Sequence, residues 1–406
     1  MKLKHKMFQS TGLAGLFIVS NSALAQTWTQ TSAPITNWHA VASSADGTKL
    51  AAVACCGGPI YTSTNGGVTW TPTSAPIQNW FSVASSADGT KLVATANTSP
   101  VYASSDSGAT WTAATNGPIT EYLSCVASSA DGTKLVVGFY DSVHRNGGMS
   151  ASTDSGAAWA ILANAPATVS VAASADGTKL FVGAGPCFGC ASASFEISTN
   201  SGANWLATSV TSSFAWSAVA SSADGNKLVA MNPNANGLIY TSSDSGATWT
   251  TNSSPGESWI SVASSADGAR LVAALGGGFN PGGPSVGGPV YSSIDSGATW
   301  TSNDVPYAFS VASSADGSKL VAAANGGGIY TAQFTPMPVL SITPSGSNLV
   351  LYWTVPSIKF VLQENPDVIK THWTDLVRTP TLILTNLQYQ ATVPLPSGNR
   401  FYRLNH

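Results

Sequence analysis

The stretch SSDSGATW, residues 104–111, recurs unchanged at residues 242–249. Four near-copies also end in Trp, so the phrase occurs six times along the chain. Its acidic position is occupied by Asn65, Asp106, Asp154, Asn200, Asp244 and Asp295. An amide oxygen can replace a carboxylate oxygen as acceptor in a tight turn, but an amide cannot replace a general acid. The two Asn residues therefore favour a structural role for the repeated position.

A second phrase, SVASSADGTKL, alternates with the first and occurs seven times. Its copies are spaced 42 to 49 residues apart, with the aspartate at Asp46, Asp88, Asp131, Asp176, Asp224, Asp267 and Asp316. A period in the forties with several short strands in each unit is typical of the blades of a β-propeller. The Asp-Gly pair supplies a local hydrogen bond and a positive φ, so we expect a turn here as well.

One repeat contains four expected strands. Residues 81–86 alternate and carry small side chains, residues 87–90 form the ADGT turn, and residues 91–96 follow as a second strand. Residues 101–105 and 110–114 flank the first phrase as third and fourth strands. Small side chains suit the innermost strand, where the sheets of a propeller converge.

The last repeat lacks its fourth strand, because residues 326–333 (GGGIYTAQ) are not followed by the turn phrase or by Trp. Residues 26–34 (QTWTQTSAP) match a fourth strand. The sequence thus predicts an all-β, seven-bladed propeller closed by its N-terminal strand, which removes an open sheet edge. Each blade then has one structural Trp, and these are Trp28, Trp70, Trp111, Trp159, Trp205, Trp249 and Trp300.

The two ends of the chain differ from the repeats. Residues 1–25 have the lysines, apolar run and Ala-Leu-Ala site of a secretory signal peptide, so we expect export to the periplasm, the cell surface or the medium. The apolar run is too short to span a membrane. The propeller covers 26–334, TPMP at 335–338 is a linker, and the short alternating segments of 339–406 predict a small β-sandwich.

Charge is sparse, and it argues against nucleic acid as a partner. Without the three lysines of the signal segment the net charge falls from −3 to −6. Binding of nucleic acid needs clustered Lys and Arg. Among the five cysteines, either Cys187–Cys190 or the adjacent Cys55–Cys56 could form a disulfide, which leaves Cys125 over. A metal site at CFGC would need more soft ligands than this region contains, and no cofactor is expected.

The S/T-x-D-x-G-x-T-W phrase resembles the Asp-box, or BNR repeat, of sialidases, some glycoside hydrolases, sortilin-type receptors and photosystem assembly factors. The resemblance covers about three quarters of the chain. It implies a propeller in which the repeated Asp is structural, but those families bind or cleave very different things. The tail is similar to C-terminal modules of exported bacterial repeat proteins.

Function is expected on the face with the loops that differ from blade to blade, because varied loops on a rigid scaffold commonly carry binding. Four tryptophans stand where the innermost strand begins on that face: Trp38, Trp80, Trp216 and Trp259. They either seal the core or form an aromatic platform for sugar rings or apolar side chains. Arg145 lies in one variable loop and is a further binding candidate.

A hydrolase would need two carboxyl groups about 5–9.5 Å apart. Five carboxylates remain when the repeated aspartates are set aside: Glu121, Asp141, Glu196, Glu257 and Asp304. Glu196 stands where five other repeats have Tyr. Sialidase activity is disfavoured, because the propeller contains only Arg145 and Arg270 and cannot build an arginine cluster.

The sequence thus predicts an exported, monomeric, non-catalytic protein that binds a glycan or a surface protein. An Asp-box glycoside hydrolase acting on polysaccharide is the alternative, and a purely structural envelope or matrix protein is a third reading.

Overall fold

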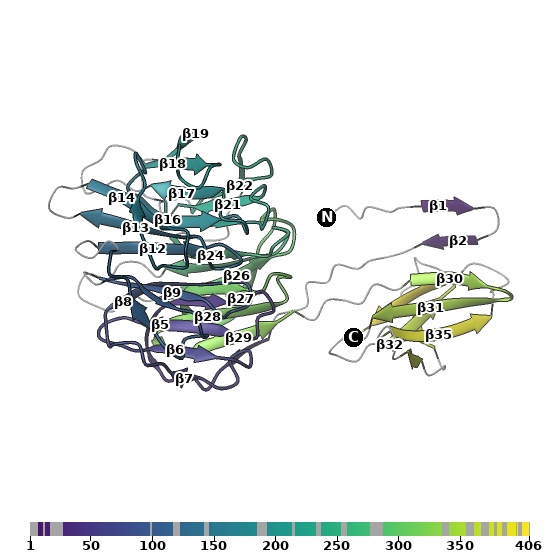
Figure 1. Ribbon diagram of the computed structural model, residues 1–406. Helices are drawn as coiled ribbons and strands as arrows, with labels where there is room; N and C mark the ends of the chain where they lie inside the picture. The colour runs from purple at the N-terminus through teal and green to yellow at the C-terminus, as the bar shows by residue number, and fades with distance from the viewer. Residues whose placement is uncertain are drawn as a thin grey trace. The chain divides into compact units, whose positions relative to one another are not determined.

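The computed structural model describes residues 7–10, 13–16, 27–97, 100–116, 122–141, 146–184, 193–212, 216–232, 237–252, 258–276, 287–334, 341–354, 361–366, 373–376, 380–383, 388–394, 396 and 400–405. The chain divides into two compact units, Ala25–Phe334 and a second unit made of Met1–Leu24 with Thr335–His406 (Figure 1). Every regular element among the described residues is a strand, so the all-β prediction is confirmed.

The larger unit repeats a four-stranded antiparallel sheet. The separate sheets are β8–β11 (Trp80–Ser85, Leu92–Ala96, Tyr102–Ser104, Thr112–Ala113), β12–β15 (Tyr122–Ser128, Leu135–Asp141, Asn146–Ser152, Ala160–Ile161), β16–β19 (Thr168–Ala173, Leu180–Ala184, Ala193–Ser198, Leu206–Ser212) and β20–β23 (Ala218–Ser221, Leu228–Met231, Ile239–Ser242, Thr250–Asn252). In each sheet the strands are paired in chain order.

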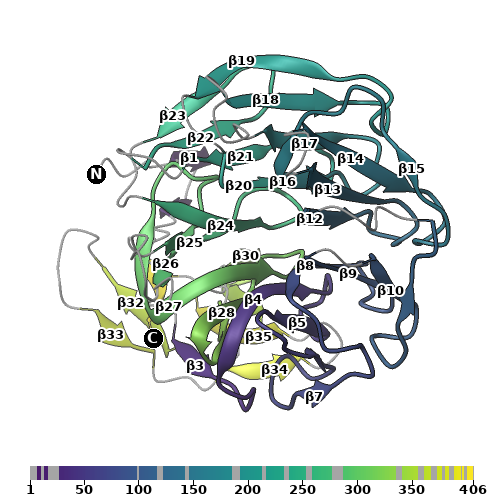
Figure 2. The same cartoon turned by 90° about the vertical axis from the view of Figure 1, so that its left-hand side faces the viewer.

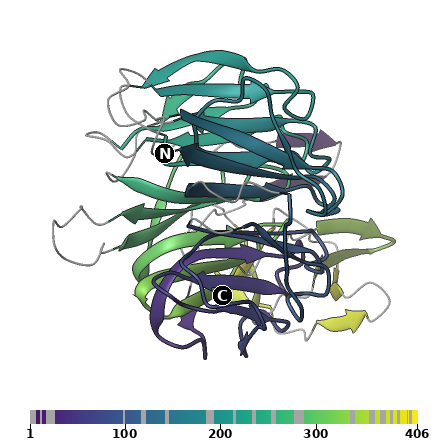
Figure 3. The same cartoon turned by 60° about the vertical axis from the view of Figure 1, so that its left-hand side comes forward.

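The first repeat and the last two repeats join in one eleven-stranded sheet. It contains β3–β7 (Trp28–Gln30, Thr36–Ser43, Leu50–Ala54, Ile60–Ser63, Thr71–Pro72) and β24–β29 (Trp259–Ser264, Leu271–Gly276, Gly287–Ser293, Thr301–Ser313, Lys319–Gly327, Ile329–Gln333). Strand β3 pairs antiparallel with β29, so that Trp28 faces Ala332, as expected for an N-terminal strand that completes the last repeat. Figures 2 and 3 show the purple strands at the start of the larger unit, which include β3 and β4, beside the light-green strands at its end, which include β28.

The seven ADG turns are linked to one another by backbone hydrogen bonds. The N–H of Ala45 donates to the carbonyl of Ala87 at 2.7 Å, and the equivalent alanine of every repeat donates to that of the next. The series runs through Ala45, Ala87, Ala130, Ala175, Ala223, Ala266 and Ala315, and Ala315 donates back to Ala45 at 2.7 Å. Seven turns thus form an unbroken cycle, which holds the first strands of neighbouring repeats together.

Each ADG turn is fixed by its aspartate. In the first, the Ser44 hydroxyl donates to Asp46 Oδ1 at 2.6 Å, and the backbone N–H of Thr48 donates to the same oxygen at 2.9 Å. Gly47 has φ +66°, in the left-handed region that favours glycine. A Cβ at Gly47 would also lie 2.9 Å from Cβ of Lys319 in the preceding repeat, so glycine meets both a conformational and a packing demand.

The SSDSGATW turns follow a second fixed pattern. Ser104 and the backbone N–H of Thr110 both donate to Asp106 Oδ1 at 2.8 Å. Asn65 accepts the equivalent bonds through its amide oxygen, at 3.0 and 2.9 Å, so this turn keeps its geometry without a charge. Gly108 has φ +87°, and Ser107 before it also has a positive φ, +59°. The Ser107 N–H donates to the Thr90 carbonyl, which places both kinds of turn at one end of the repeat.

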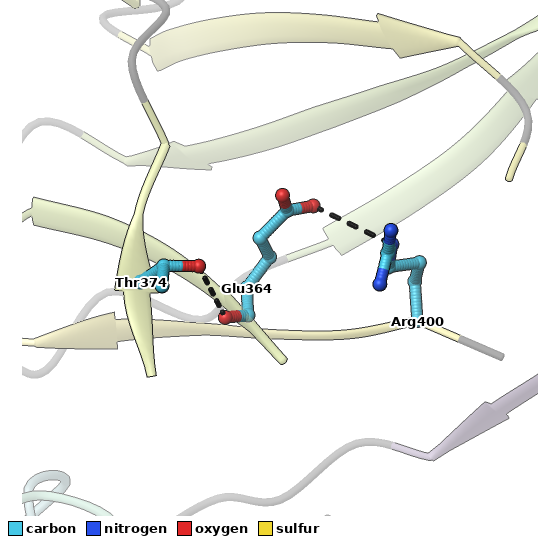
Figure 4. A network of polar contacts seen from close by, with 3 residues as sticks. All are labelled: Glu364, Thr374 and Arg400. Atoms are coloured by element: carbon cyan, nitrogen blue, oxygen red, sulfur yellow. Dashed lines mark hydrogen bonds and ion pairs between the residues drawn. The ribbon is translucent and has the colours of Figure 1, made fainter. Parts of the chain in front are cut away.

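The smaller unit is built from two antiparallel sheets and one hairpin. The sheets are β30, β31, β35 and β34 (Ser341–Ser345, Asn348–Thr354, Gln388–Pro394, Thr381–Ile383) and β33, β32 and β36 (Thr374–Asp375, Val361–Asn365, Phe401–Asn405), and the hairpin is β1 with β2 (Met7–Ser10, Leu13–Leu16). Leu351 of the first sheet and Leu362 and Tyr402 of the second are buried in one cluster. At the surface, Glu364 lies 3.9 Å from Arg400, and its carbonyl accepts from Thr374 (Figure 4).

Candidate functional site

The repeated aspartates lie at the end of the sheets that carries the ADG and SSDSGATW turns, which we call the turn end. Their carboxylates act as hydrogen-bond acceptors. Hydrogen bonds to Asp46, first from the Ser44 hydroxyl and then from the Thr48 backbone, lower the pKa of its carboxyl to about 2. The hydroxyl and backbone N–H of Thr110, followed by Ser104, likewise lower the pKa of Asp106 to about 2. A carboxyl held ionised in this way is unsuited to general acid catalysis near neutral pH.

The four tryptophans expected at the start of the innermost strands are part of the core. Trp38, Trp80, Trp216 and Trp259 are each 0% exposed. Each stands edge-on to the third-strand tyrosine of its own sheet, with ring centroids 5.5 Å apart for Trp38 and Tyr61. A stacking platform needs an exposed ring face, so the platform hypothesis is corrected to core packing for all four residues.

The six tryptophans that end the SSDSGATW-type turns, and Trp28 of β3, are partly buried. Trp70 packs against a cluster that contains Val41 of the first repeat and Val321 of the last, so it lies between neighbouring repeats. Four of them donate from Nε1 to the glycine carbonyl of the turn, as Trp111 does to Gly108 at 3.1 Å. Their arrangement is that of structural residues.

Most of the other candidates lie beyond the described part of the chain. Glu121, Arg145, Cys187, Cys190 and Glu257 fall outside the described residues, and Asp141 and Asp304 are described only by their backbones, in β13 and β27. Glu196 of β18 is half-buried, and Oε1 accepts a hydrogen bond from Ser194 at 2.8 Å. It pairs with Val182 as Tyr61 pairs with Ala52, which confirms that Glu196 replaces the third-strand tyrosine.

The structure reveals a feature at the opposite end of the first strands, where the variable loops also attach. Six of the seven first strands have a register shift at one equivalent residue, immediately after the Trp38 position. A β-bulge turns the extra residue out of the ladder and re-aims its side chain. We call the residues at this position the bulge ring: His39, Phe81, Ser124, Val169, Ser217, Ile260 and Phe309.

The first strands form a closed ring around the unit, because the first strand of each repeat contacts that of the next, from β4 through β27 and back to β4. The bulge ring contains no charged side chain, and it is partly exposed, with Val169 at 39%. Two of its members bridge to a neighbouring repeat: Ser124 donates to the Thr168 carbonyl at 2.7 Å, and His39 Nδ1 lies 2.6 Å from the Phe81 carbonyl.

Three aromatic members of the ring come together. The imidazole of His39 lies 4.2 Å from the ring centroid of Phe81 and 4.8 Å from that of Phe309, each in a neighbouring repeat. Burial lowers the pKa of His39, although the bond to the Phe81 carbonyl acts to raise it. The neutral imidazole and the two phenyl rings therefore form an apolar patch, which we call the bulge cluster.

Sequence reasoning missed this site although the signal was present. His39, Phe81, Val169, Ile260 and Phe309 vary within an otherwise repetitive strand. In a regular strand, successive side chains point to opposite faces of the sheet. The residue after each tryptophan was therefore not expected at the same end of the strand as a candidate binding residue.

Two cavities lie at the opposite, turn end, next to the uncharged turns. One of about 520 Å³ is lined by Asn200, Asn204, Trp205 and Thr208 together with the turn at Ser245. Another of about 520 Å³ is lined by residues that include Asn65 and Lys319. Trp205 Nε1 and Thr208 Oγ1 are buried without a hydrogen-bond partner.

Among the described residues, no group of three or more His, Cys, Asp or Glu side chains could hold a metal ion. The described residues also contain no helix long and apolar enough to cross a membrane.

Comparison with known proteins identifies the fold. YCF48 bound to D1 peptide matches at 15% identity over 77% of this chain and 96% of that chain, with a TM-score of 0.55. YCF48 from Cyanidioschyzon merolae matches at 15% identity over 76% of this chain and 99% of that chain, also with a TM-score of 0.55. Together with the small antiparallel sheets, these matches define a β-propeller.

A GH74 xyloglucanase from Xanthomonas campestris is also similar, at 13% identity over 81% of this chain and 78% of that chain. Its TM-score of 0.42 is too low to carry an argument about activity. No family model matches the sequence, and no curated protein does.

Proposed function

We propose that the chain is an exported, non-catalytic binding protein: a seven-bladed Asp-box propeller with a C-terminal β-sandwich, which recognises an apolar segment of an extracellular or surface protein. The cycle of seven turn hydrogen bonds and the pairing of β3 with β29 support seven blades closed by the N-terminal strand. The two aspartate-centred turn patterns support the Asp-box assignment.

The bulge cluster is the observation that carries the binding proposal. Its three rings are partly exposed, come from three different repeats, and lie at the end of the sheets where the loops vary. Binding energy in protein interfaces is concentrated in a few aromatic anchors near the centre of a patch. The neutral, apolar character of the cluster suits a hydrophobic side chain from a partner, and the match to YCF48 bound to a peptide is consistent with this use of the fold.

A tiled peptide array and a glycan array, each probed with the mature chain, test this proposal. We expect saturable binding to peptides with apolar residues, and a loss of about 30-fold in affinity for Phe81→Ser with Phe309→Ser, the range of interface hot spots. Ile161→Ser and Leu206→Ser are matched controls, because these side chains are 77% and 72% exposed on outer strands. Binding to glycans but not to peptides would replace the protein partner with a glycan, and equal loss in the controls would remove the bulge cluster from the site.

The hydrolase alternative has one specific observation in its favour, the half-buried carboxylate of Glu196. Polysaccharide turnover by the parent that is abolished in Glu196→Gln, with Ser194→Ala as a folding control, would favour hydrolysis over binding. Background turnover in parent and variants alike would exclude it for the substrates tried.

A further inference from the structure

The loop that connects β5 to β6 holds two adjacent cysteines side by side. The Sγ atoms of Cys55 and Cys56 lie 3.2 Å apart. Consecutive side chains in an extended strand point to opposite faces, so this proximity requires a turn. Cys56 provides it with φ +60°, in the left-handed region that residues other than glycine seldom occupy.

The loop is tied to the rim of the bulge ring. The N–H of Cys55 donates to the Asn37 carbonyl at 2.9 Å, two residues before His39. The N–H of Gly57 donates to Asn79 Oδ1 at 3.1 Å, two residues before Phe81. The cysteine pair is therefore held between the segments that lead into two members of the bulge cluster.

The spacing of the pair limits how stable a bond between the two sulfurs can be. Consecutive Cα atoms lie about 3.8 Å apart across a trans peptide. Disulfides usually join Cα atoms about 4.4–6.8 Å apart, and departures from this range store strain and make the bond easier to reduce. Strained or exposed disulfides have more oxidising potentials, which is the property of labile rather than structural bonds.

We propose that Cys55 and Cys56 form a reversible vicinal disulfide, a redox-sensitive modification site on the loop beside the bulge cluster. Oxidation requires an external disulfide of the glutathione or thiol-oxidoreductase class. The Cys56 thiolate attacks this disulfide and releases one thiol; the Cys55 sulfur then attacks Cys56 Sγ and releases the second. The two cysteines lose two protons and two electrons, one S–S bond forms, and the oxidant becomes two thiols.

The surroundings assign different roles to the two sulfurs. Cys56 is exposed and can be reached by an external disulfide, whereas Cys55 is half-buried. Burial, followed by the hydrogen bond to Cys56, raises the pKa of the Cys55 thiol to about 12, so Cys56 rather than Cys55 makes the first attack. Cys125 is buried in another repeat, where burial raises the pKa of its thiol to about 11, and it is the natural control.

Peptide mapping of the full chain tests the proposal cleanly, because trypsin should release residues 50–91 with Cys55 and Cys56 as their only cysteines. The chain is equilibrated in glutathione buffers from fully reduced to fully oxidised, quenched with an alkylating agent and digested. We expect this peptide to change from two alkylated thiols to an internal disulfide, in over about nine tenths of molecules, and to revert when reduced glutathione is restored.

Two variants separate the proposal from other thiol chemistry. Cys55→Ser should leave Cys56 as a persistent mixed disulfide with glutathione, because no second thiol can release it. Cys125→Ser should leave the behaviour of the 50–91 peptide unchanged. A peptide that stays a dithiol in excess glutathione disulfide, or that carries glutathione without closing its own bond, overturns the proposal. A bond that reduced glutathione cannot open would make the pair a structural disulfide and overturns the reversible site.

Discussion

The two ends of each sheet in the larger unit obey different rules. At the turn end, all seven repeats use the same Ser-Asp contact, the same left-handed glycine and the same bond to the next repeat. At the bulge end, six of the seven first strands share a backbone irregularity, but the strands carry His, Phe, Ser, Val and Ile at one equivalent position. Uniform hydrogen bonding maintains the ring, and the bulge allows side chains to differ without disturbing it. The uniform end therefore stabilises the ring, and the variable end of the same strands is where we propose recognition.

Removal of residues 27–33 should have the largest effect, because β3 covers the edge of β29 and brings Trp28 into the packing between the sixth and last repeats. We expect the free energy of unfolding to fall by more than about 5 kcal/mol, beyond the range of single core substitutions. Urea denaturation followed by Trp fluorescence measures it. Thr29→Ala with Gln30→Ala, both exposed, keeps the strand and serves as control. A truncated chain as stable as the parent would contradict closure by the N-terminal strand.

Trp80→Ala should have the next largest effect, although it lies at the bulge end. Its side chain is fully buried against Tyr102, so truncation leaves a cavity and should destabilise by roughly 3–5 kcal/mol. Leu206→Ala, at an exposed position, should change stability by under about 0.5 kcal/mol. If Trp80→Ala had the thermal midpoint of the parent but lost binding, the indole would belong to the binding surface. The boundary between stabilising and binding residues would then lie one residue earlier in the first strand.

Acid should act on the turn end. The Ser86 hydroxyl and then the Thr90 backbone lower the pKa of Asp88 to about 2, below about 3.9 for an unfolded chain. A depressed carboxyl pKa contributes stability above the unfolded value, and that contribution disappears as the pH falls through the folded value. Urea midpoints should therefore be nearly constant from pH 7 to about 4 and decline from about 4 to 2. A decline confined to pH 6–5 would point to other groups.

Asp106→Asn should have the smallest effect, because Asn65 and Asn200 already accept the same backbone hydrogen bonds. We expect a thermal midpoint close to that of the parent, measured by circular dichroism. Asp106→Leu removes the acceptor altogether and should melt clearly earlier. Equal losses in the two variants would show that the charge, rather than the acceptor, holds the turn.

The sequence alone determined the features that depend on local chemistry and on period. The Asp-Gly turns, the strand order within a repeat and the borrowed strand at Trp28 follow from short-range hydrogen bonding and from a missing phrase in the last repeat. These features recur because every copy of the repeat forms the same short-range hydrogen bonds.

Only the tertiary structure decided which end-of-strand residues become neighbours. His39 meets Phe81 and Phe309 because the ring returns on itself, and no local pattern relates residues 39 and 309. The burial of Trp38 and the outward position of His39 both depend on a bulge, which is a register difference between two strands rather than a property of either sequence. Long-range closure and register therefore created the candidate site, while local turns created the scaffold that holds it.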